Sequence, residues 1–443
     1  MDITSEMGTY LLSARYVIIN AKKVIVDGAI LVKDDIILDI GEKKSLLYKY
    51  RNQPLIDFKD SLIAPGFINT HTHAAMVAMR GLADDLPLKT WLENFIWPVE
   101  LKLVKRDFIR KALPLAIYEM LASGITTFVD MYFFQDTAAQ IVKEAGIRAV
   151  LGEGLIDFKT PAFDNPEEAL NFTESFIKEY KRDPLVIPAV APHAPYSCSK
   201  ELLLKAKTLA DRYDVPVLIH VAETKWEFEE IKNKYGDTPF TYLHKIGFLD
   251  NKVISAHSVW VSEEDMDIIL KDKVNISHNP ESNAKLSSGI APVAEYLERG
   301  INVSLGTDGA ASNNNLDFIE EMRTASFLQK IKYMDPVKLS AREVFHMATQ
   351  GGADAIGLGD KLGSLEKGKL ADIIVLNLNS PHLKPVYDPY SHLVYSAKAS
   401  DITHVIVNGE FLLKDGTPTT LDCERIFTDI KELEQEIIKE LNL

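Results

Sequence analysis

Six of the eleven histidines stand at or beside short apolar runs, and this placement is the first sign of chemistry in the sequence. They are His71, His73, His193, His220, His257 and His278. His71 and His73 are separated by one residue at the end of such a run. In an extended strand alternate side chains share a face, so both imidazoles can point the same way. Two nitrogen ligands at this spacing suit Zn²⁺ or Fe²⁺, although the pair is too short to establish a metal site alone.

Eight apolar runs divide the middle of the chain, and longer segments with helical apolar spacing lie between them. The runs are residues 62–70, 125–131, 147–155, 186–193, 215–222, 253–257, 274–279 and 301–308. Residues 107–123, followed by a stop at Gly124, and residues 200–213 are the clearest helices. Eight strand–helix units over about 300 residues predict a (β/α)8 TIM barrel, with an open doubly wound sheet as the alternative.

The two ends of the chain are rich in short β segments instead. They are residues 16–19, 23–26, 29–32 and 36–41 near the start, and 372–376 and 404–409 near the end. Asn408-Gly409 between apolar runs is typical of a β-hairpin. We therefore expect a small β-sandwich domain built from residues 1–61 and residues 365–443, the second part with a C-terminal helix. Residues 62–364 are expected to form the metal-dependent barrel.

Barrel enzymes carry their catalytic groups at the C-terminal ends of the strands, which is where the six histidines fall. His220 ends the fifth expected strand, and Asp308 ends the eighth. Together with His71 and His73 they would supply three nitrogens and one carboxylate to a divalent metal. The combination is far more specific than the His-X-His pair.

Four segments resemble the metal motifs of the amidohydrolase superfamily and occur in its order. They are residues 65–73 (PGFINTHTH), 220–223 (HVAE), 277–283 (SHNPESN) and 305–309 (LGTDG). Residues 363–372 (GSLEKGKLAD) resemble the return into the β domain. Residues 79–86 (MRGLADDL) and 97–100 (WPVE) resemble the methylthioadenosine/S-adenosylhomocysteine deaminase group. The resemblance spans nearly the whole chain and implies hydrolytic deamination of a 6-aminopurine nucleoside.

The resemblance also bears on the number of metals. Binuclear members bridge two metals with a modified lysine at the end of strand four, where this chain reads APHAPY at residues 191–196. No lysine stands in this segment, so one divalent metal is expected. Zn²⁺ is the first expectation and Fe²⁺ the alternative, because nitrogen and carboxylate ligands suit both.

Hydrolytic deamination needs a nucleophilic water and proton donors, and a divalent metal lowers the pKa of its water toward about 7. Asp308 is placed to accept the water proton, and His257 to hydrogen-bond the hydroxide. Glu223 could contact the substrate and protonate a ring nitrogen, the role of the non-ligand glutamate in zinc nucleobase deaminases. The resemblance implies that Glu100 holds the two ribose hydroxyls, which one carboxylate can accept together. His193 is expected to contact the purine or the ribose.

Glu153 departs from some relatives, which carry an arginine near the end of strand three that reaches the substrate. A substrate-binding carboxylate here would favour hydroxyls or a neutral or cationic 5′ group. S-Adenosylhomocysteine then falls behind 5′-deoxyadenosine, methylthioadenosine and adenosine. Nearby Trp91, Phe95 and Trp97 fit an apolar lid and ordinary core equally well.

The composition argues against several other classes of protein. The net charge is −15 and no basic cluster is present, which disfavours nucleic acid. No apolar run approaches the roughly 20 residues that cross a bilayer. Cys198 and Cys423 are too few for a disulfide framework, and residues 1–6 lack a secretory signal, so a cytoplasmic protein is expected.

Two other functions stay open, and the oligomeric state is open as well, with a homo-oligomer possible. The chain could hydrolyse another aminated or halogenated ring, as a triazine chlorohydrolase or a guanine or cytosine deaminase does. A non-catalytic assembly module is a reading of a different class, but such a protein should have lost ligands. All four expected ligands are present here.

Overall fold

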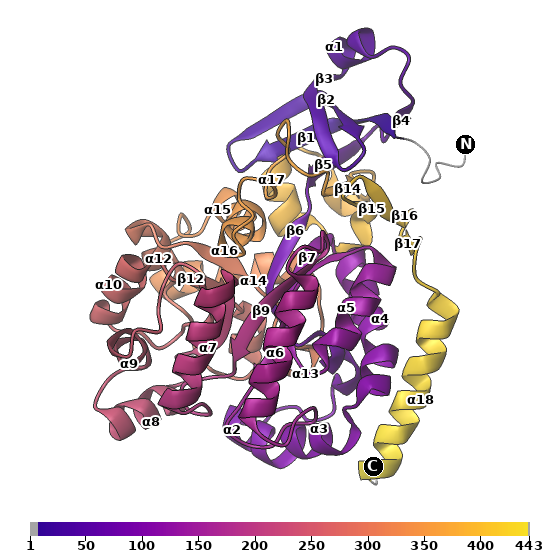
Figure 1. Ribbon diagram of the computed structural model, residues 1–443. Helices are drawn as coiled ribbons and strands as arrows, with labels where there is room; N and C mark the ends of the chain where they lie inside the picture. Colours follow the sequence, from indigo (N-terminus) through magenta and orange to yellow (C-terminus); the bar gives the residue numbers. More distant parts are fainter. Residues whose placement is uncertain (1–7, 442–443) are drawn as a thin grey trace.

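Eight parallel strands form a barrel in the middle of the chain, which confirms the expected (β/α)8 architecture (Figure 1). The computed structural model describes residues 8–441; residues 1–6, whose composition predicts no secretory signal, lie outside this range. The barrel strands are β6 (Phe67–Thr72), β7 (Ile125–Tyr132), β8 (Arg148–Leu155), β9 (Val186–Pro192), β10 (Val217–Val221), β11 (Val253–His257), β12 (Asn275–His278) and β13 (Val303–Leu305). Each strand pairs in parallel with the next.

The barrel is closed between β13 and β6 by individual hydrogen bonds rather than by a described backbone ladder. The Thr70 hydroxyl donates to the Leu305 carbonyl at 2.9 Å, and the Asp308 N–H donates to the His71 carbonyl at 2.9 Å. The second bond joins the backbones of two expected metal ligands, which are more than two hundred residues apart in the chain.

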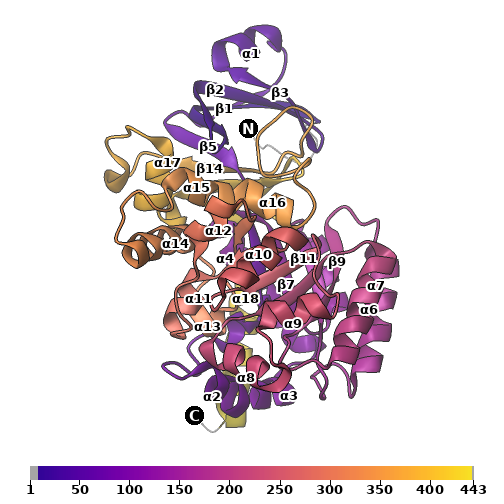
Figure 2. The same ribbon diagram turned by 90° about the vertical axis from the view of Figure 1, so that its left-hand side faces the viewer.

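Helices surround the barrel on its outer side (Figures 1 and 2). The longer ones are α4 (Arg106–Ala122), α5 (Gln135–Ala145), α6 (Pro166–Tyr180), α7 (Lys200–Tyr213), α8 (Lys225–Tyr235), α10 (Glu263–Asp272), α14 (Phe318–Tyr333) and α18 (Cys423–Leu441). The shorter ones include α1 (Lys43–Lys49), α2 (Leu88–Trp91), α3 (Trp97–Leu103), α9 (Pro239–Lys245), α11 (Pro280–Lys285), α12 (Val293–Arg299), α13 (Ala310–Asn313), α15 (Ala341–His346), α16 (Gly352–Ala355) and α17 (Pro389–Ser391). Local signals set their ends: Ser199 caps α7 by accepting the Leu202 N–H, and Gly124 follows α4 with a φ of 90°.

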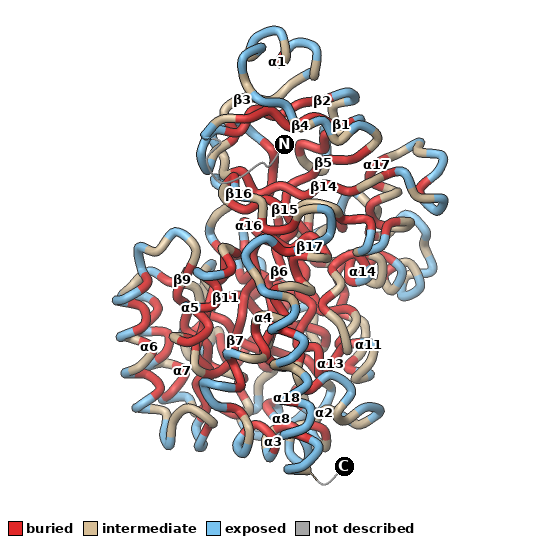
Figure 3. The backbone as a smooth tube through the Cα atoms, turned by 90° about the vertical axis from the view of Figure 1, so that its right-hand side faces the viewer, coloured by how far each residue is buried: buried red, intermediate tan, exposed pale blue. Residues whose placement is uncertain are grey.

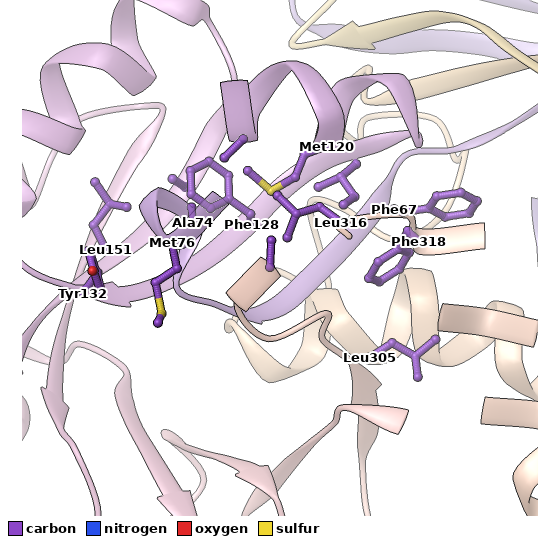
Figure 4. Close-up of a cluster of buried hydrophobic side chains, with 14 of the residues drawn as sticks. Phe67, Ala74, Met76, Met120, Phe128, Tyr132, Leu151, Leu305, Leu316 and Phe318 are labelled. Carbon is purple, nitrogen blue, oxygen red and sulfur yellow. The ribbon is translucent and has the colours of Figure 1, made fainter. Parts of the chain in front are cut away.

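Two apolar cores lie on the two sides of the barrel wall. The larger core fills the space between the strands and the surrounding helices, where the chain in Figure 3 is mostly buried. Phe67 of β6 and Phe318 of α14 pack there with ring centroids 5.6 Å apart (Figure 4). The smaller core fills the barrel interior. In β8, Val150 faces the interior and Leu151 faces the helices, because alternate side chains of a strand point to opposite sides.

Both ends of the chain contribute to one further sheet of nine strands, as their β-rich composition predicts. Its strands are β1 (Thr9–Asn20), β2 (Lys23–Lys33), β3 (Ile36–Glu42), β4 (Leu55–Asp57), β5 (Ser61–Pro65), β14 (Ile373–Asn377), β15 (Ile402–Val407), β16 (Glu410–Lys414) and β17 (Thr417–Pro418). β14 pairs with β5, so the two ends meet in the middle of the sheet. Asn408 and Gly409 form the expected hairpin turn, with φ values of 49° and 78°.

The apolar run at residues 62–70, expected as one barrel strand, forms two strands in different sheets. β5 pairs with β1 and β14 in the outer sheet, whereas β6 pairs with β7 in the barrel. Gly66 lies between them, and a Cβ added there would stand only 2.2 Å from the Thr126 side chain. The division of the chain at residues 61/62 and 364/365 stays a prediction.

The chain ends in α18, which lies beside α4 on the outside of the barrel (Figure 1). Leu433 and Ile437 of α18 are buried against the larger core. No helix within residues 8–441 is long and apolar enough to cross a membrane.

Candidate active site

The four expected metal ligands meet at the C-terminal end of the barrel. The Nε2 atoms of His71 and His73 lie 3.3 and 3.4 Å from Asp308 Oδ1. The Nε2 atom of His73 also lies 3.2 Å from that of His220. Three ring nitrogens and one carboxylate oxygen thus converge on one point.

Backbone carbonyls fix which nitrogen of each ring faces this point. His73 Nδ1 lies 2.5 Å from the Met131 carbonyl, and His220 Nδ1 lies 2.8 Å from the His193 carbonyl. A carbonyl can only accept a hydrogen bond, so each Nδ1 carries the proton and each Nε2 directs a lone pair inward. His71 Nε2 is buried without a hydrogen-bond partner among the described residues. This donor set fits a divalent metal such as Zn²⁺ or Fe²⁺.

The electrostatics of the ligands agree with this assignment. Burial lowers the pKa of His71 to about 4 and that of His220 well below its ordinary value, so both rings are neutral at pH 7. Burial alone would raise the pKa of Asp308, but the neighbouring histidines outweigh it and hold this pKa well below the ordinary value. Ser282 and Ser312 donate to Asp308 Oδ2 at 2.6 and 2.9 Å, which leaves Oδ1 toward the histidines.

His257 stands beside the ligands with its ring held by a side-chain amide. Its Nδ1 lies 2.8 Å from Asn283 Oδ1, and an amide oxygen only accepts, so Nδ1 is protonated. Its Nε2 lies 3.8 Å from Glu223 Oε2. Burial would lower the pKa of His257, but the charges of Glu223 and Asp308 outweigh it and raise this pKa. His257 is therefore suited to hold a proton beside two carboxylates.

Glu223 is buried in the wall of the site and accepts a hydrogen bond from Ser288 Oγ at 3.4 Å. Burial raises its pKa, and His257 opposes the change. Glu227 was not foreseen from the sequence, yet it accepts the backbone N–H groups of Ala222 and Glu223, both at 2.8 Å. Its place as the third residue of α8, after a threonine cap, was the available signal.

A cavity of about 710 Å³ opens from the metal ligands. His73, His220 and Asp308 form one end, and apolar side chains that include Trp91 and Met131 form much of the wall. A flat, largely apolar ligand with one polar edge would fit this lining.

Glu100 and His193 both line this cavity. The Tyr132 hydroxyl donates to Glu100 Oε1 at 2.8 Å, and burial raises the pKa of Glu100 to about 7 although this hydrogen bond opposes it. His193 Nδ1 lies 2.7 Å from Ser197 Oγ, and burial lowers the pKa of His193 to about 3. Tyr132 was missed because the expected strand ended one residue before it.

Glu153 lies elsewhere than expected. Its side chain is fully buried outside the cavity and accepts the N–H groups of Phe134 and Gln135, at 3.2 and 2.9 Å, at the start of α5. Strand alternation explains this position, because Gly152 faces the barrel interior and the next residue faces the helices. Contact between Glu153 and the substrate is therefore not supported by the structure.

Two further residues singled out in the sequence do not line the cavity. Phe95 is 42% exposed, whereas Trp91 and Trp97 do face the cavity. His278 is buried at the end of β12, and burial lowers its pKa to about 3. Trp91 and Trp97 thus line the cavity, and Trp91 also belongs to the larger buried core.

Comparison with known proteins identifies similar sequences and structures. The model of the amidohydrolase family matches residues 62–412. A 5-methylthioadenosine/S-adenosylhomocysteine deaminase of Thermodesulfovibrio yellowstonii is 48% identical over 94% of this chain and 96% of that protein. A 5′-deoxyadenosine deaminase of Methanothermobacter thermautotrophicus is 45% identical over 89% of this chain and 91% of that protein. The crystal structure of an adenosine deaminase from Xanthomonas campestris with bound zinc has a TM-score of 0.93 and 33% identity, covering 97% and 98% of the two chains.

Proposed function

The chain belongs to the amidohydrolase family, and we propose that it is a single-metal hydrolytic deaminase of 6-aminopurine nucleosides. It would convert methylthioadenosine, 5′-deoxyadenosine, adenosine or S-adenosylhomocysteine to the inosine form and release ammonia. One observation carries the proposal: a metal-ligand cluster with buried Glu223 beside it at one end of a cavity that Glu100 also lines.

His71, His73, His220 and Asp308 would hold the metal, for which we propose Zn²⁺, with Fe²⁺ as the alternative. When bound, a divalent metal lowers the pKa of a water from ~15.7 to ~7 and so provides a nucleophile near neutral pH. One metal is proposed because β9 ends without a lysine that could bridge a second.

The residues around the metal ligands would accept and donate the protons of the reaction. Asp308 accepts the proton of the water through Oδ1, while Ser282 holds its other oxygen. His257 directs Nε2 toward the nucleophile, because Asn283 holds its other nitrogen. Glu223, whose pKa is raised by burial, donates a proton to the ring nitrogen beside the attacked carbon. The proton held by Asp308 then passes to the amino group, which departs as ammonia, and the new hydroxyl returns a proton to Glu223 as it becomes the carbonyl of the product.

The ribose would lie near Glu100. One carboxylate can accept hydrogen bonds from two neighbouring hydroxyls, and Tyr132 fixes the orientation of this carboxylate. His193 lines the same cavity, and its Nδ1 is occupied by Ser197, which leaves Nε2 for the purine or the ribose.

The test combines an ultraviolet assay against a nucleoside panel with a measurement of bound metal. We expect the metal-loaded protein to convert adenosine-type nucleosides to the inosine form. His71→Ala should lose metal and activity together, whereas His244→Ala, a histidine paired with Asp272 away from the cavity, should keep both. Full metal occupancy in His71→Ala would refute the ligand assignment, and no turnover of any nucleoside by the loaded protein would overturn the function.

A cytoplasmic location and the absence of nucleic-acid or membrane partners stay predictions from the sequence, and a homo-oligomer stays a possibility. Gel filtration of the purified protein measures the oligomeric state directly.

A further inference from the structure

A second compartment of about 690 Å³ lies next to the catalytic cavity. Leu88, Leu92, Trp97 and Tyr196 line both spaces and so form the boundary between them. These residues come from the α2–α3 region and from the loop after β9. Helices α2, α3 and α8 gather at the same end of the barrel (Figures 1 and 2). We call this second space the outer compartment.

Two exposed aromatic side chains line the outer compartment. Phe158 is 44% exposed and stands edge-on to Trp97, with ring centroids 5.2 Å apart. Trp226 is 36% exposed and stands edge-on to Tyr196, also at 5.2 Å. Exposed aromatic groups collected around an opening mark a binding surface more often than isolated ones do. The lining therefore favours an apolar ligand group.

The charges at the outer compartment disfavour an anion. Lys89 Nζ lies 4.9 Å from the centroid of the Trp226 ring and 3.8 Å from Glu93 Oε1. Glu230 adds a second carboxylate to the same lining. The one ammonium group is thus already engaged by an aromatic face and a carboxylate, and a further anion would meet a net negative charge.

The direction of the substrate links the two spaces, and this step rests on the proposed function. With the amino group of the purine at the metal ligands and the ribose hydroxyls at Glu100, the 5′ carbon points away from the metal. Trp97 lies three residues before Glu100 on α3 and lines both the cavity and the outer compartment. The 5′ substituent would therefore pass this boundary.

We propose that the outer compartment binds the 5′ substituent, and that Phe158 and Trp226 select extended uncharged thioethers over anionic groups. The enzyme would then accept 5′-alkylthio groups well beyond the length of a methylthio group. This assignment replaces Glu153, which lies outside the cavity, as the determinant of the 5′ preference.

Three nucleosides test the inference: adenosine, 5′-butylthio-5′-deoxyadenosine and its 5′-(3-carboxypropylthio) analogue of similar length. Wild type should use the butylthio compound with a kcat/KM at least equal to that of adenosine and about tenfold above that of the carboxylate. Phe158→Ala and Trp226→Ala should each lower the butylthio-to-adenosine ratio of kcat/KM on the order of tenfold, mainly through KM, because each buried methylene contributes to binding. Phe327→Ala, which removes a ring of similar exposure on α14, should leave the ratio unchanged.

Charge is tested separately with the double variant Glu93→Gln/Glu230→Gln. It should raise kcat/KM for the carboxypropylthio compound several-fold and leave adenosine unchanged. An unchanged ratio in both aromatic variants would overturn the inference while adenosine turnover still supports the deaminase function. A clear preference of wild type for the carboxylate or for S-adenosylhomocysteine would overturn it as well. If none of the nucleosides reacts, the proposed deaminase function is refuted as well.

Discussion

Glu223 is the residue whose replacement should separate metal binding from proton transfer. It lies 3.8 Å from His257 but is no member of the four-ligand set. Glu223→Gln keeps the shape and removes the acidic proton, so we expect metal content to stay at the wild-type level. General acid–base catalysis contributes about 10²–10⁴-fold, and kcat should fall within this range.

Glu229→Gln, on the exposed side of α8, is the matched control and should leave kcat unchanged. Normal turnover by Glu223→Gln would show that the Glu223 carboxyl does not donate the proton.

Glu100 should impose a pH dependence on substrate capture. Burial raises its pKa to about 7, so the free enzyme carries the ionised carboxylate mainly above that pH. Ribose hydroxyls donate to the ionised form, and kcat/KM should therefore fall roughly tenfold for each pH unit below about 7. Tyr132→Phe removes the hydrogen bond that lowers this pKa, so the midpoint should move to higher pH.

Profiles of kcat/KM against pH for wild type, Tyr132→Phe and Glu100→Gln check this assignment. Glu100→Gln should show low kcat/KM without this acidic limb, since its amide does not titrate. If the acidic limb of the profile persists in Glu100→Gln, this limb reports the titration of another group.

At the scale of elements, the short helix α11 orients two catalytic groups at once. Ser282 donates to Asp308, and the next residue, Asn283, holds His257. Asn283→Ala frees the His257 ring to rotate and to change tautomer. Loss of such supporting hydrogen bonds costs about 10–100-fold, and we expect kcat to fall by this factor while KM and metal content change little.

Asn314→Ala provides the comparison for Asn283→Ala, because Asn314 contacts Lys285 and Asp84 rather than the catalytic groups. A rise in KM alone in Asn283→Ala, with kcat unchanged, would contradict the role of Asn283 in positioning His257.

At the scale of the whole molecule, Arg148 ties the barrel to the outer sheet. It is almost fully buried at the start of β8 and hydrogen-bonds Asp372, just before β14, and Asn408 in the β15–β16 turn. Arg148→Ala leaves the buried Asp372 carboxylate without its cationic partner, and breaking a buried pair in this way costs about 3–5 kcal/mol. The free energy of unfolding, measured with urea, should fall by this amount.

The double variant Arg148→Met/Asp372→Asn removes both charges and should be less destabilised than Arg148→Ala. Activity of the folded variants should match wild type, because Arg148 does not line the cavity. A loss below about 1 kcal/mol in Arg148→Ala would show that the pair contributes no more than an exposed one.

Local sequence patterns predicted the parts of this protein that depend on neighbouring residues alone. Seven of the eight apolar runs each locate one barrel strand, and the first divides between β5 and β6. His71 and His220 lie next to the last residue of their strands, and Asp308 lies three residues after β13. The barrel then brings these ends to one rim, so the ligand set could be inferred before any distance was known. The hairpin turn at Asn408 and Gly409 could likewise be predicted from neighbouring residues alone.

Only the tertiary structure decided where side chains point and which distant segments meet. Glu153 and Glu223 are both glutamates near strand ends, but strand alternation turns the first toward α5 and the loop held by Glu227 turns the second toward the metal ligands. The outer compartment joins segments that lie far apart in the chain, from Leu88 to Glu230. An apolar run locates a strand through its own residues, whereas the extent of the strand and the surroundings of its side chains are set by the packing of the whole chain.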